Sequence, residues 1–200
     1  MSVMPSVPPP AAPAAHTPLT VAQAAAWAQT LGLPRLDVQV LLLHALSRAL
    51  HDRAWLLAHG DDLLDTTAQT TFAAHAQRRL NTEPVAYITG QKEFFGLTLH
   101  VDHRVLDPRA DTETLVEWAL SCLADTPSPD VMDLGTGSGA IALSLKHTRP
   151  DAQVCAVDAS ADALAVASAN AERLALPVDF HHGSWLAPLN GRTFDAIVSN

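Results

Sequence analysis

The feature that most constrains the fold is a glycine-rich stretch, Asp133-Leu-Gly-Thr-Gly-Ser-Gly139, which overlaps the end of a short apolar run at 131–134. Glycine adopts backbone conformations that other residues avoid, so glycines after a strand allow a sharp turn and the close approach of a ligand. A helix expected over 139–147 would offer free N–H groups at its start. The stretch therefore predicts a strand, a tight loop and a helix, with a ligand at the loop.

The residues after this loop continue the alternation of strand and helix. We expect strands at 154–157, 178–181 and 194–198, and a helix over 161–174. Such alternation predicts an α/β fold with a parallel sheet, which binds ligands at the carboxyl ends of its strands. A doubly wound sheet has more strands than these, so we expect an incomplete sheet and a chain that is a fragment.

The residues before this region suggest other domains. The Pro/Ala-rich residues 1–19 predict a disordered tail. Apolar residues recur at helical spacing around 21–31, 38–49 and 66–79, which predicts an N-terminal helical bundle over residues 20–82.

A different pattern joins this bundle to the α/β part. Strand period at 97–101, punctuated by Gly90 and Gly96, predicts a linker with a β-hairpin over residues 83–107. A helix over 111–124 then begins the α/β domain, which we assign to residues 108–200.

Composition narrows the class of protein. The net charge is −9 and no block of Lys and Arg interrupts it, which argues against direct nucleic-acid binding. No apolar run reaches the roughly 20 residues that cross a bilayer, and no signal peptide is evident, so we expect no membrane association and a cytoplasmic protein. Cys122 and Cys155 show no metal-ligand spacing, and we expect both to be buried thiols. The oligomeric state is left open.

Three interpretations of the glycine loop compete. Gly135-x-Gly137-x-x-Ala140 fits the dinucleotide fingerprint. The glycine at 139 and the acid at 133 favour S-adenosylmethionine, which has no pyrophosphate but carries an ammonium that an acid near the loop can offset. The third interpretation is a glycine-rich turn without a ligand. Under the favoured interpretation the cofactor contacts Gly135, Thr136, Gly137, Ser138 and Gly139.

Two further residues at strand ends are candidates for the same ligand. Asp158 can accept hydrogen bonds from both ribose hydroxyls, a role shared with nicotinamide cofactors; the alternative is an exposed loop residue. Trp185 can cover an adenine ring; the alternative is packing in the core. For His181 and His182 we expect at most a polar surface pair and no metal, because no third ligand keeps spacing with them.

Several motifs together resemble one family from about residue 20 to the end of the chain. Glu83-Pro-Val-Ala-Tyr-Ile-Thr-Gly90 is similar to the family's linker, and Pro108-Arg109-x-Asp111-Thr-Glu113 is similar to its signature before the catalytic domain. Ile197-Val-Ser-Asn200 resembles the start of its Val-Ser-Asn-Pro-Pro-Tyr segment. The family is that of the bacterial N5-glutamine methyltransferases that modify peptide-chain release factors. Asp107, Ala110 and Ser184 depart from its usual pattern.

The resemblance implies a helical substrate-recognition domain, then a Rossmann-like class I S-adenosylmethionine-dependent methyltransferase domain. It implies methylation of the glutamine amide in the Gly-Gly-Gln motif of release factors, which supports translation termination. Asn200 would be the catalytic residue and would face both cofactor and substrate. Two alternatives stay open: an N-methyltransferase acting on DNA or another protein, and a non-catalytic helical interaction module with a degenerate methyltransferase fold.

Overall fold

The chain forms two compact units that divide between Thr89 and Gly90. In this computed structural model, residues 18–189 and 191–200 are described. We call the part before the division the helical unit and the part after it the α/β unit. The linker expected over 83–107 is thus shared between the two units. The expected disordered tail lies, apart from its last two residues, outside the described residues.

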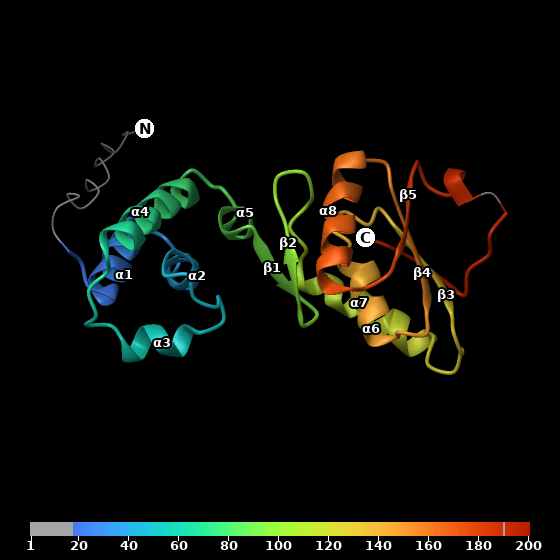
Figure 1. The fold of residues 1–200 in the computed structure, drawn as a ribbon, viewed down its shortest axis with the longest axis horizontal. Coiled ribbons are helices and arrows are strands. Elements are labelled where there is room, and N and C mark those ends of the chain that lie inside the picture. Colours follow the sequence, from blue (N-terminus) through green and yellow to red (C-terminus); the bar gives the residue numbers. More distant parts are fainter. Residues whose placement is uncertain (1–17, 190) are drawn as a thin grey trace, which may run out of the picture. The chain divides into compact units, whose positions relative to one another are not determined.

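The helical unit consists of short helices (Figure 1). They are α1 (Val21–Thr30), α2 (Arg35–Ala45), α3 (Arg53–Ala58), α4 (Thr66–Leu80) and α5 (Val85–Thr89). The sequence predicted α1 and α4 to within a few residues, whereas α2 ends earlier than the expected 49. Thr20 and Gln23 start α1 with a reciprocal capping box, which satisfies two backbone N–H groups at its first turn.

The core of the helical unit is apolar and centres on α2, which packs against α1, α3, α4 and α5. The largest of its fully buried side chains are Phe72, Leu41, Leu42 and Leu43. One partly buried ion pair, from Arg79 Nε to Asp37 Oδ2 at 2.7 Å, joins α4 to α2. Hydrophobic burial is therefore the main source of this unit's stability.

The α/β unit opens with the expected hairpin, β1 (Gln91–Phe94) and β2 (Leu97–His100), paired antiparallel. Its two-residue turn, Phe95-Gly96, has positive φ at both positions, which matches the twist of the strands. Along β2 the leucines are buried while Thr98 and His100 are exposed, as the strand period predicted.

The second sheet of this unit is parallel and has the order β5-β4-β3-β6. After the hairpin, the helices and strands of the α/β unit are η1 (Ala110–Thr112), α6 (Glu113–Cys122), β3 (Asp130–Leu134), α7 (Ala140–Thr148), β4 (Gln153–Asp158), α8 (Ala161–Leu174), β5 (Asp179–His182), η2 (Ala187–Leu189) and β6 (Ala196–Ser199). The predicted α/β fold with a parallel sheet is confirmed, and the fold is Rossmann-like. The chain runs from β3 through β4 to β5 and then returns to the other side of β3, so strand order reverses beside β3. Ligands of such sheets bind at the carboxyl ends of the strands at this reversal.

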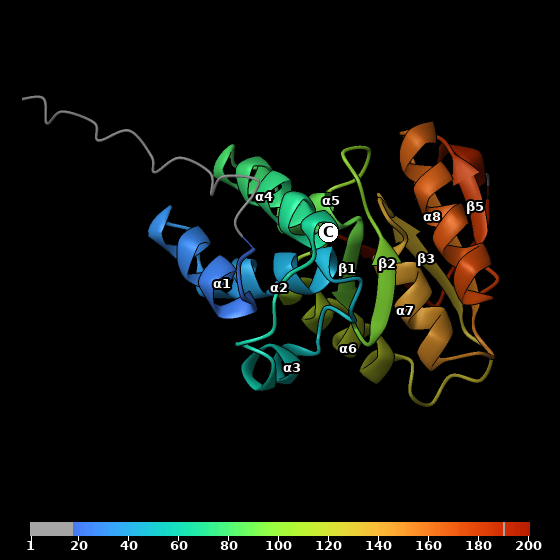
Figure 2. The ribbon, with the colours of Figure 1, turned by 60° about the vertical axis from the view of Figure 1, so that its left-hand side comes forward.

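The two faces of this sheet are covered differently. Both crossovers, β3-α7-β4 and β4-α8-β5, step in the same direction, so α7 and α8 lie on the same face of the sheet (Figure 1). Figure 2 shows α8 beside the edge strand β5. The opposite face carries an apolar cluster that contains Met132, Leu134, Cys155, Val157, Leu189 and Phe194.

The expectation for the cysteines is half wrong. Cys155 is buried, but Cys122 is exposed. Cys122 is the last residue of α6 and is exposed although Ala119, one turn before it, is buried, so an apolar sequence neighbourhood did not place it in the core. Within 18–189 and 191–200, no helix is long and apolar enough to cross a membrane.

Candidate functional site

The glycine loop joins β3 to α7 at the point where strand order reverses. Gly135, Gly137 and Gly139 all have positive φ, so a side chain at any of them would strain the backbone. A Cβ at Gly135 or Gly137 would meet no atom within 4 Å, which leaves the backbone there open to a ligand. A Cβ at Gly139 would lie 3.0 Å from Leu143 Cδ1 and 3.3 Å from Ala167 Cβ, so this glycine also permits close packing.

Asp133 lies beneath the loop and braces it. Its Oδ2 accepts hydrogen bonds from the Thr136 hydroxyl at 2.7 Å and from the Ala142 backbone N–H at 3.2 Å. The side chain is 1% exposed, and burial raises the pKa of this carboxyl to about 6, with the two hydrogen bonds opposing the rise. The Asp133 carboxylate does not line the cavity described below, and the expectation that this acid offsets a ligand's ammonium stays a prediction.

Asn170 on α8 connects the loop to the hairpin. It is fully buried, and its Nδ2 donates to the Ser138 carbonyl at 3.0 Å and to the His100 carbonyl at 2.9 Å. Its Oδ1 accepts from the His100 N–H at 2.7 Å. One side chain thereby fixes the glycine loop against β2.

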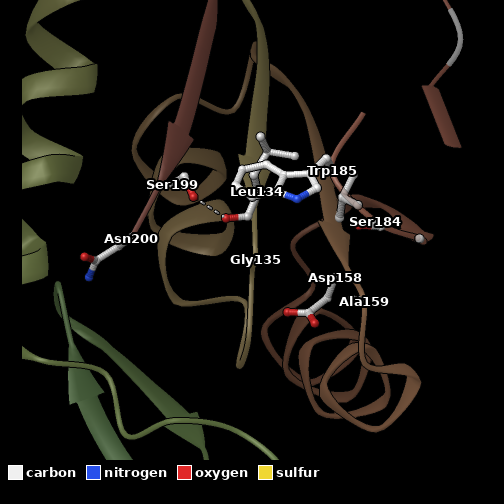
Figure 3. A pocket seen from close by; sticks show the side chains of 10 residues that line it. Leu134, Gly135, Asp158, Ala159, Ser184, Trp185, Ser199 and Asn200 are labelled. Carbon is white, nitrogen blue, oxygen red and sulfur yellow. Dashed lines mark hydrogen bonds between the residues drawn. The ribbon is translucent and has the colours of Figure 1, made fainter. Parts of the chain in front are cut away.

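A cavity of about 210 Å³ opens beside the loop, at the carboxyl ends of β3, β4, β5 and β6 (Figure 3). It is lined by Leu134, Gly135, Val157, Asp158, Ala159, Gly183, Ser184, Trp185, Ser199 and Asn200. Four of the residues expected to bind the cofactor therefore line one cavity: Gly135, Asp158, Trp185 and Asn200. The other four, Thr136, Gly137, Ser138 and Gly139, belong to the loop but do not line the cavity. The assignment of all eight residues to cofactor binding stays a prediction.

Asp158 and Trp185 line the cavity from the ends of β4 and β5 (Figure 3). Asp158 Oδ2 accepts from the Gly137 N–H and Oδ1 from the Ser160 N–H, both at 2.9 Å. Because a carboxylate offers about four lone-pair sites, each oxygen can accept one more hydrogen bond. Trp185 is 73% exposed and has a positive φ of 51°, so its indole is not part of the core.

Asn200 follows β6 and is held from two directions. The Ser199 hydroxyl donates to the Leu134 carbonyl at 2.9 Å, which ties the end of β6 to β3. The Asn200 Nδ2 donates to the Thr112 hydroxyl at 2.6 Å. Since Asn200 and Asp158 both line the cavity, a ligand there would contact polar groups from β4 and from the end of β6 together.

Comparison with known proteins agrees with this architecture. Residues 16–90 match the PrmC N-terminal domain, and residues 110–200 match the methyltransferase small domain. A release factor glutamine methyltransferase of Xylella fastidiosa is 48% identical over 174 residues, which cover 86% of this chain and 62% of that protein. The corresponding protein of Bordetella pertussis is 47% identical over 170 residues, covering 84% and 62%. That of Escherichia coli is 42% identical over 168 residues, covering 84% and 59%.

The chain is similar to release factor glutamine methyltransferases over most of its own length. It spans about three fifths of the length of the curated relatives it matches.

The three departures from the family pattern have visible surroundings. Asp107 forms an ion pair with Lys92, whose Nζ lies 3.1 Å from Asp107 Oδ1, so the added charge is compensated. Ala110 begins η1. Ser184 lines the cavity next to Trp185.

Sequence reasoning did not single out several residues of this site. Five residues line the cavity because they lie at the last or next-to-last position of a strand or directly follow a strand: Leu134, Val157, Ala159, Gly183 and Ser199. Position at a strand end was the signal that could have found them. A polar residue on the otherwise apolar face of α8 was the corresponding signal for Asn170.

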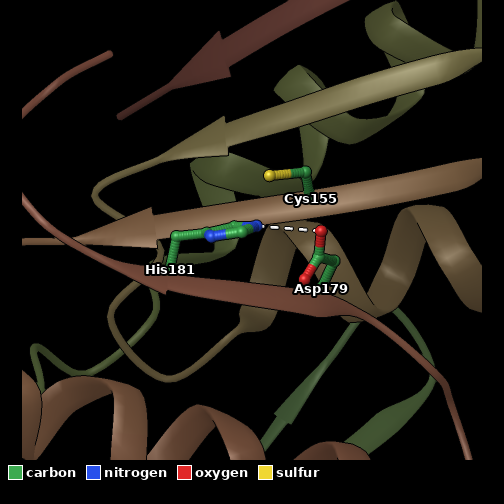
Figure 4. A group of neighbouring side chains, drawn as sticks. All are labelled: Cys155, Asp179 and His181. Carbon is green, nitrogen blue, oxygen red and sulfur yellow. Dashed lines mark ion pairs between the residues drawn. The ribbon is translucent and has the colours of Figure 1, made fainter. Parts of the chain in front are cut away.

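A second group of polar side chains lies on β4 and β5, on the face of the sheet away from α7 and α8 (Figure 4). It consists of Cys155, Asp179 and His181. Asp179 Oδ2 is 2.8 Å from His181 Nε2 and 3.3 Å from Arg192 Nη1, so a guanidinium already neutralises it. Burial raises the pKa of the Cys155 thiol, which disfavours the thiolate that binds metals. We therefore interpret this group as an ion-pair cluster. His182 points to the other face of β5, so the two histidines do not form a pair.

Proposed function

We propose that the protein transfers a methyl group from S-adenosylmethionine to the side-chain nitrogen of the glutamine in the Gly-Gly-Gln motif of release factors. The proposal concerns the complete protein, since this chain spans about three fifths of its relatives. The observation that carries it is Asn200, which lies at the end of β6 and lines the same cavity as Asp158 and Trp185. Similarity to the release factor glutamine methyltransferases supports the choice of substrate.

The residues present fit the cofactor. Gly135 leaves open backbone, Asp158 offers free lone pairs for two ribose hydroxyls, and Trp185 presents an exposed aromatic face. Small-molecule pockets measure about 300–1,000 Å³, so a cavity of 210 Å³ would hold part of this ligand. When bound, the cofactor supplies an electrophilic methyl group on a positively charged sulfur.

A contact within the loop argues against a nicotinamide dinucleotide. A pyrophosphate needs free backbone N–H groups at the helix start. Here the Gly137 N–H already donates to the Asp158 carboxylate at 2.9 Å. An anionic ligand at this position would lose that donor and meet a negative charge, whereas a cationic ligand meets no such repulsion.

Asn200 would act on the nucleophile. The nitrogen of a glutamine amide is a weak nucleophile because its lone pair is delocalised into the carbonyl group. The Asn200 Oδ1 can accept one amide hydrogen and so hold the nitrogen in line with the methyl group. Its contribution is positioning and a preorganised dipole rather than acid–base chemistry.

The overall charge fits a protein substrate. A net charge of −9 disfavours binding to a nucleic-acid backbone, so we propose that the enzyme meets the release factor itself. Release factors act in translation, so we place the reaction in the cytoplasm. In the helical unit the substrate-recognition role implied by the resemblance stays a prediction.

The test uses the protein expressed from its complete gene, a release factor and isotopically labelled S-adenosylmethionine, with mass spectrometry to locate the methyl group. Wild type should label the Gly-Gly-Gln glutamine, and Asn200→Ala should lower kcat roughly 100-fold, because misplacement by about 1 Å costs that much. Calorimetry should show similar affinity of both proteins for S-adenosylhomocysteine.

Asn81→Ala is the matched control, because Asn81 is an exposed residue at the end of α4. It should methylate like wild type. Unchanged turnover in Asn200→Ala would refute the role of Asn200. Labelling of another residue by wild type would keep the chemistry and refute the substrate.

A further inference from the structure

We propose that Thr112 is a positioning residue that holds the Asn200 carboxamide by its Nδ2 and leaves Oδ1 free for the substrate. The inference rests on the proposed function, in which Asn200 aligns the glutamine amide. It gives a role to Thr112, one residue of the Arg109-x-Asp111-Thr112-Glu113 signature. Thr112 and Asn200 are 88 positions apart in the sequence.

Thr112 ends η1 and leads directly into α6 with helical backbone angles. Its side chain makes no capping hydrogen bond, and the hydroxyl oxygen accepts from Asn200 Nδ2 at 2.6 Å. Thr112 is 9% exposed, so water competes poorly for this bond. The hydroxyl therefore serves Asn200 rather than the helix.

This bond engages one branch of the Asn200 side chain. A carboxamide carries an acceptor oxygen on one branch and two N–H donors on the other. With Nδ2 bonded to Thr112, Oδ1 occupies the branch that remains free. The proposed reaction needs an acceptor there, because a rotated carboxamide would present N–H groups to the N–H groups of the substrate.

The surroundings hold both partners in place. The bond from Ser199 to Leu134 fixes the backbone before Asn200, so rotation of its side chain is the main freedom left. On the other side, the Thr112 N–H donates to the Arg109 carbonyl at 3.0 Å. Glu113 Oε1 accepts from the Phe95 N–H at 3.0 Å, which anchors the start of α6 to the hairpin turn. Thr112 is thus a fixed partner that restrains the Asn200 side chain.

The experiment compares Thr112→Val with Thr112→Ser in the protein expressed from its complete gene. Valine keeps the shape and removes the acceptor, whereas serine keeps the hydroxyl. Loss of one buried hydrogen bond predicts a fall in kcat of about 10-fold for Thr112→Val. The affinity for S-adenosylhomocysteine and the Tm should change little, and Thr112→Ser should restore most of the rate. Thr114→Val, at an exposed position of α6, is the matched control.

Two further measurements separate positioning from a general structural effect. In an Asn200→Ala background, Thr112→Val should lower kcat no further, because Thr112 acts through Asn200. The ¹⁵N–¹H signals of the Asn200 side-chain amide should shift and exchange faster in Thr112→Val but not in Thr112→Ser, whether or not the protein turns over.

The outcomes are distinguishable. A wild-type protein that methylates no release factor refutes the proposed function, while the amide signals still report on Thr112. Wild-type kcat in Thr112→Val, equal damage from serine and valine, or an undiminished effect in the Asn200→Ala background would each overturn the role of Thr112.

Discussion

The two units of this protein bury different kinds of side chain. In the helical unit the buried residues that the structure describes are almost all apolar, and the polar ones are His75 and Thr89. The buried polar residues described in the α/β unit are Thr112, Asp133, Thr136, Ser138, Ser144 and Asn170. All but Ser144 hold the glycine loop, the hairpin or Asn200 through side-chain hydrogen bonds or backbone groups.

This difference in buried side chains shows which part of the chain needs a defined geometry. Burying a polar group costs free energy unless it is hydrogen-bonded, whereas an apolar core tolerates substitution if its volume is kept. Satisfied polar networks make a structure unique and rigid. The helical unit therefore obtains its stability from an apolar core, whereas the α/β unit also buries hydrogen-bonded polar groups that fix its glycine loop and Asn200.

The largest effect should follow loss of the helical core. Phe72 is 1% exposed and packs edge-on against Trp27, with ring centroids 6.1 Å apart. Phe72→Ala should destabilise the helical unit by about 3–5 kcal/mol, since it leaves a cavity. Urea unfolding followed by circular dichroism measures the loss, and Phe72→Leu should cost less. S-adenosylhomocysteine affinity should stay unchanged; a large loss of affinity would contradict the division of tasks.

The next effect concerns the buried carboxyl of Asp133. Its pKa is raised from 3.8 to about 6, chiefly by burial, so the folded protein binds this proton more tightly than the unfolded chain. Above about pH 6 the Asp133 carboxyl is ionised in the folded protein, and its charge then lowers the free energy of unfolding by the full amount. This destabilisation disappears as the pH falls toward 3.8. One pKa unit corresponds to about 1.4 kcal/mol. The Asp133→Asn variant should therefore have a free energy of unfolding that is higher than that of wild type by up to about 3 kcal/mol at pH 8 and almost equal to it at pH 4.

Urea unfolding of the α/β unit between pH 4 and pH 8 checks this prediction. Asp125→Asn, at an exposed position of the same unit, is the control and should show no such trend. If Asp133→Asn gains equally at both pH values, the buried charge is not the source of the instability. Loss of S-adenosylhomocysteine binding in the stabilised variant would show that the carboxylate is retained for the loop.

The smallest effect belongs to the histidine pair of the helical unit. The rings of His44 and His75 lie 5.0 Å apart between α2 and α4. Burial lowers the pKa of both, Arg78 lowers both further, and His44 adds to the effect on His75. The unfolded chain then binds protons that the folded unit does not, so stability should fall as pH decreases below about 6.5. His75→Gln should flatten this dependence in urea unfolding between pH 7 and pH 5; a dependence as steep as in wild type would contradict it.

The sequence predicted those elements whose signal is local. The range of α8 agrees with the expected 161–174, and β2 follows its alternation of leucines with polar residues. Helices α3 and α5 were not predicted individually, because six and five residues are too few to show a helical period. Of the site, the strand ends and the glycines were predictable, since position after a strand is visible in the chain.

The contacts that define the site were not predictable in this way. The bonds from Asn200 to Thr112 and from Asn170 to His100 join residues 88 and 70 positions apart. Only the packing of α6 and α8 on their sheets brings these partners together. The burial of Asp133 was missed for the same reason, because an acid before a glycine loop has the same sequence signature whether it faces a ligand or the core.

The exposed position of Trp185 also gives the site an optical signal. The chain has four tryptophans, and Trp185 is the one that lines the cavity. Because the residue is 73% exposed to water, its fluorescence should peak at long wavelength and be quenched readily by iodide. With Trp27, Trp55 and Trp118 replaced by phenylalanine, occupancy of the cavity could be followed in real time from this single emitter.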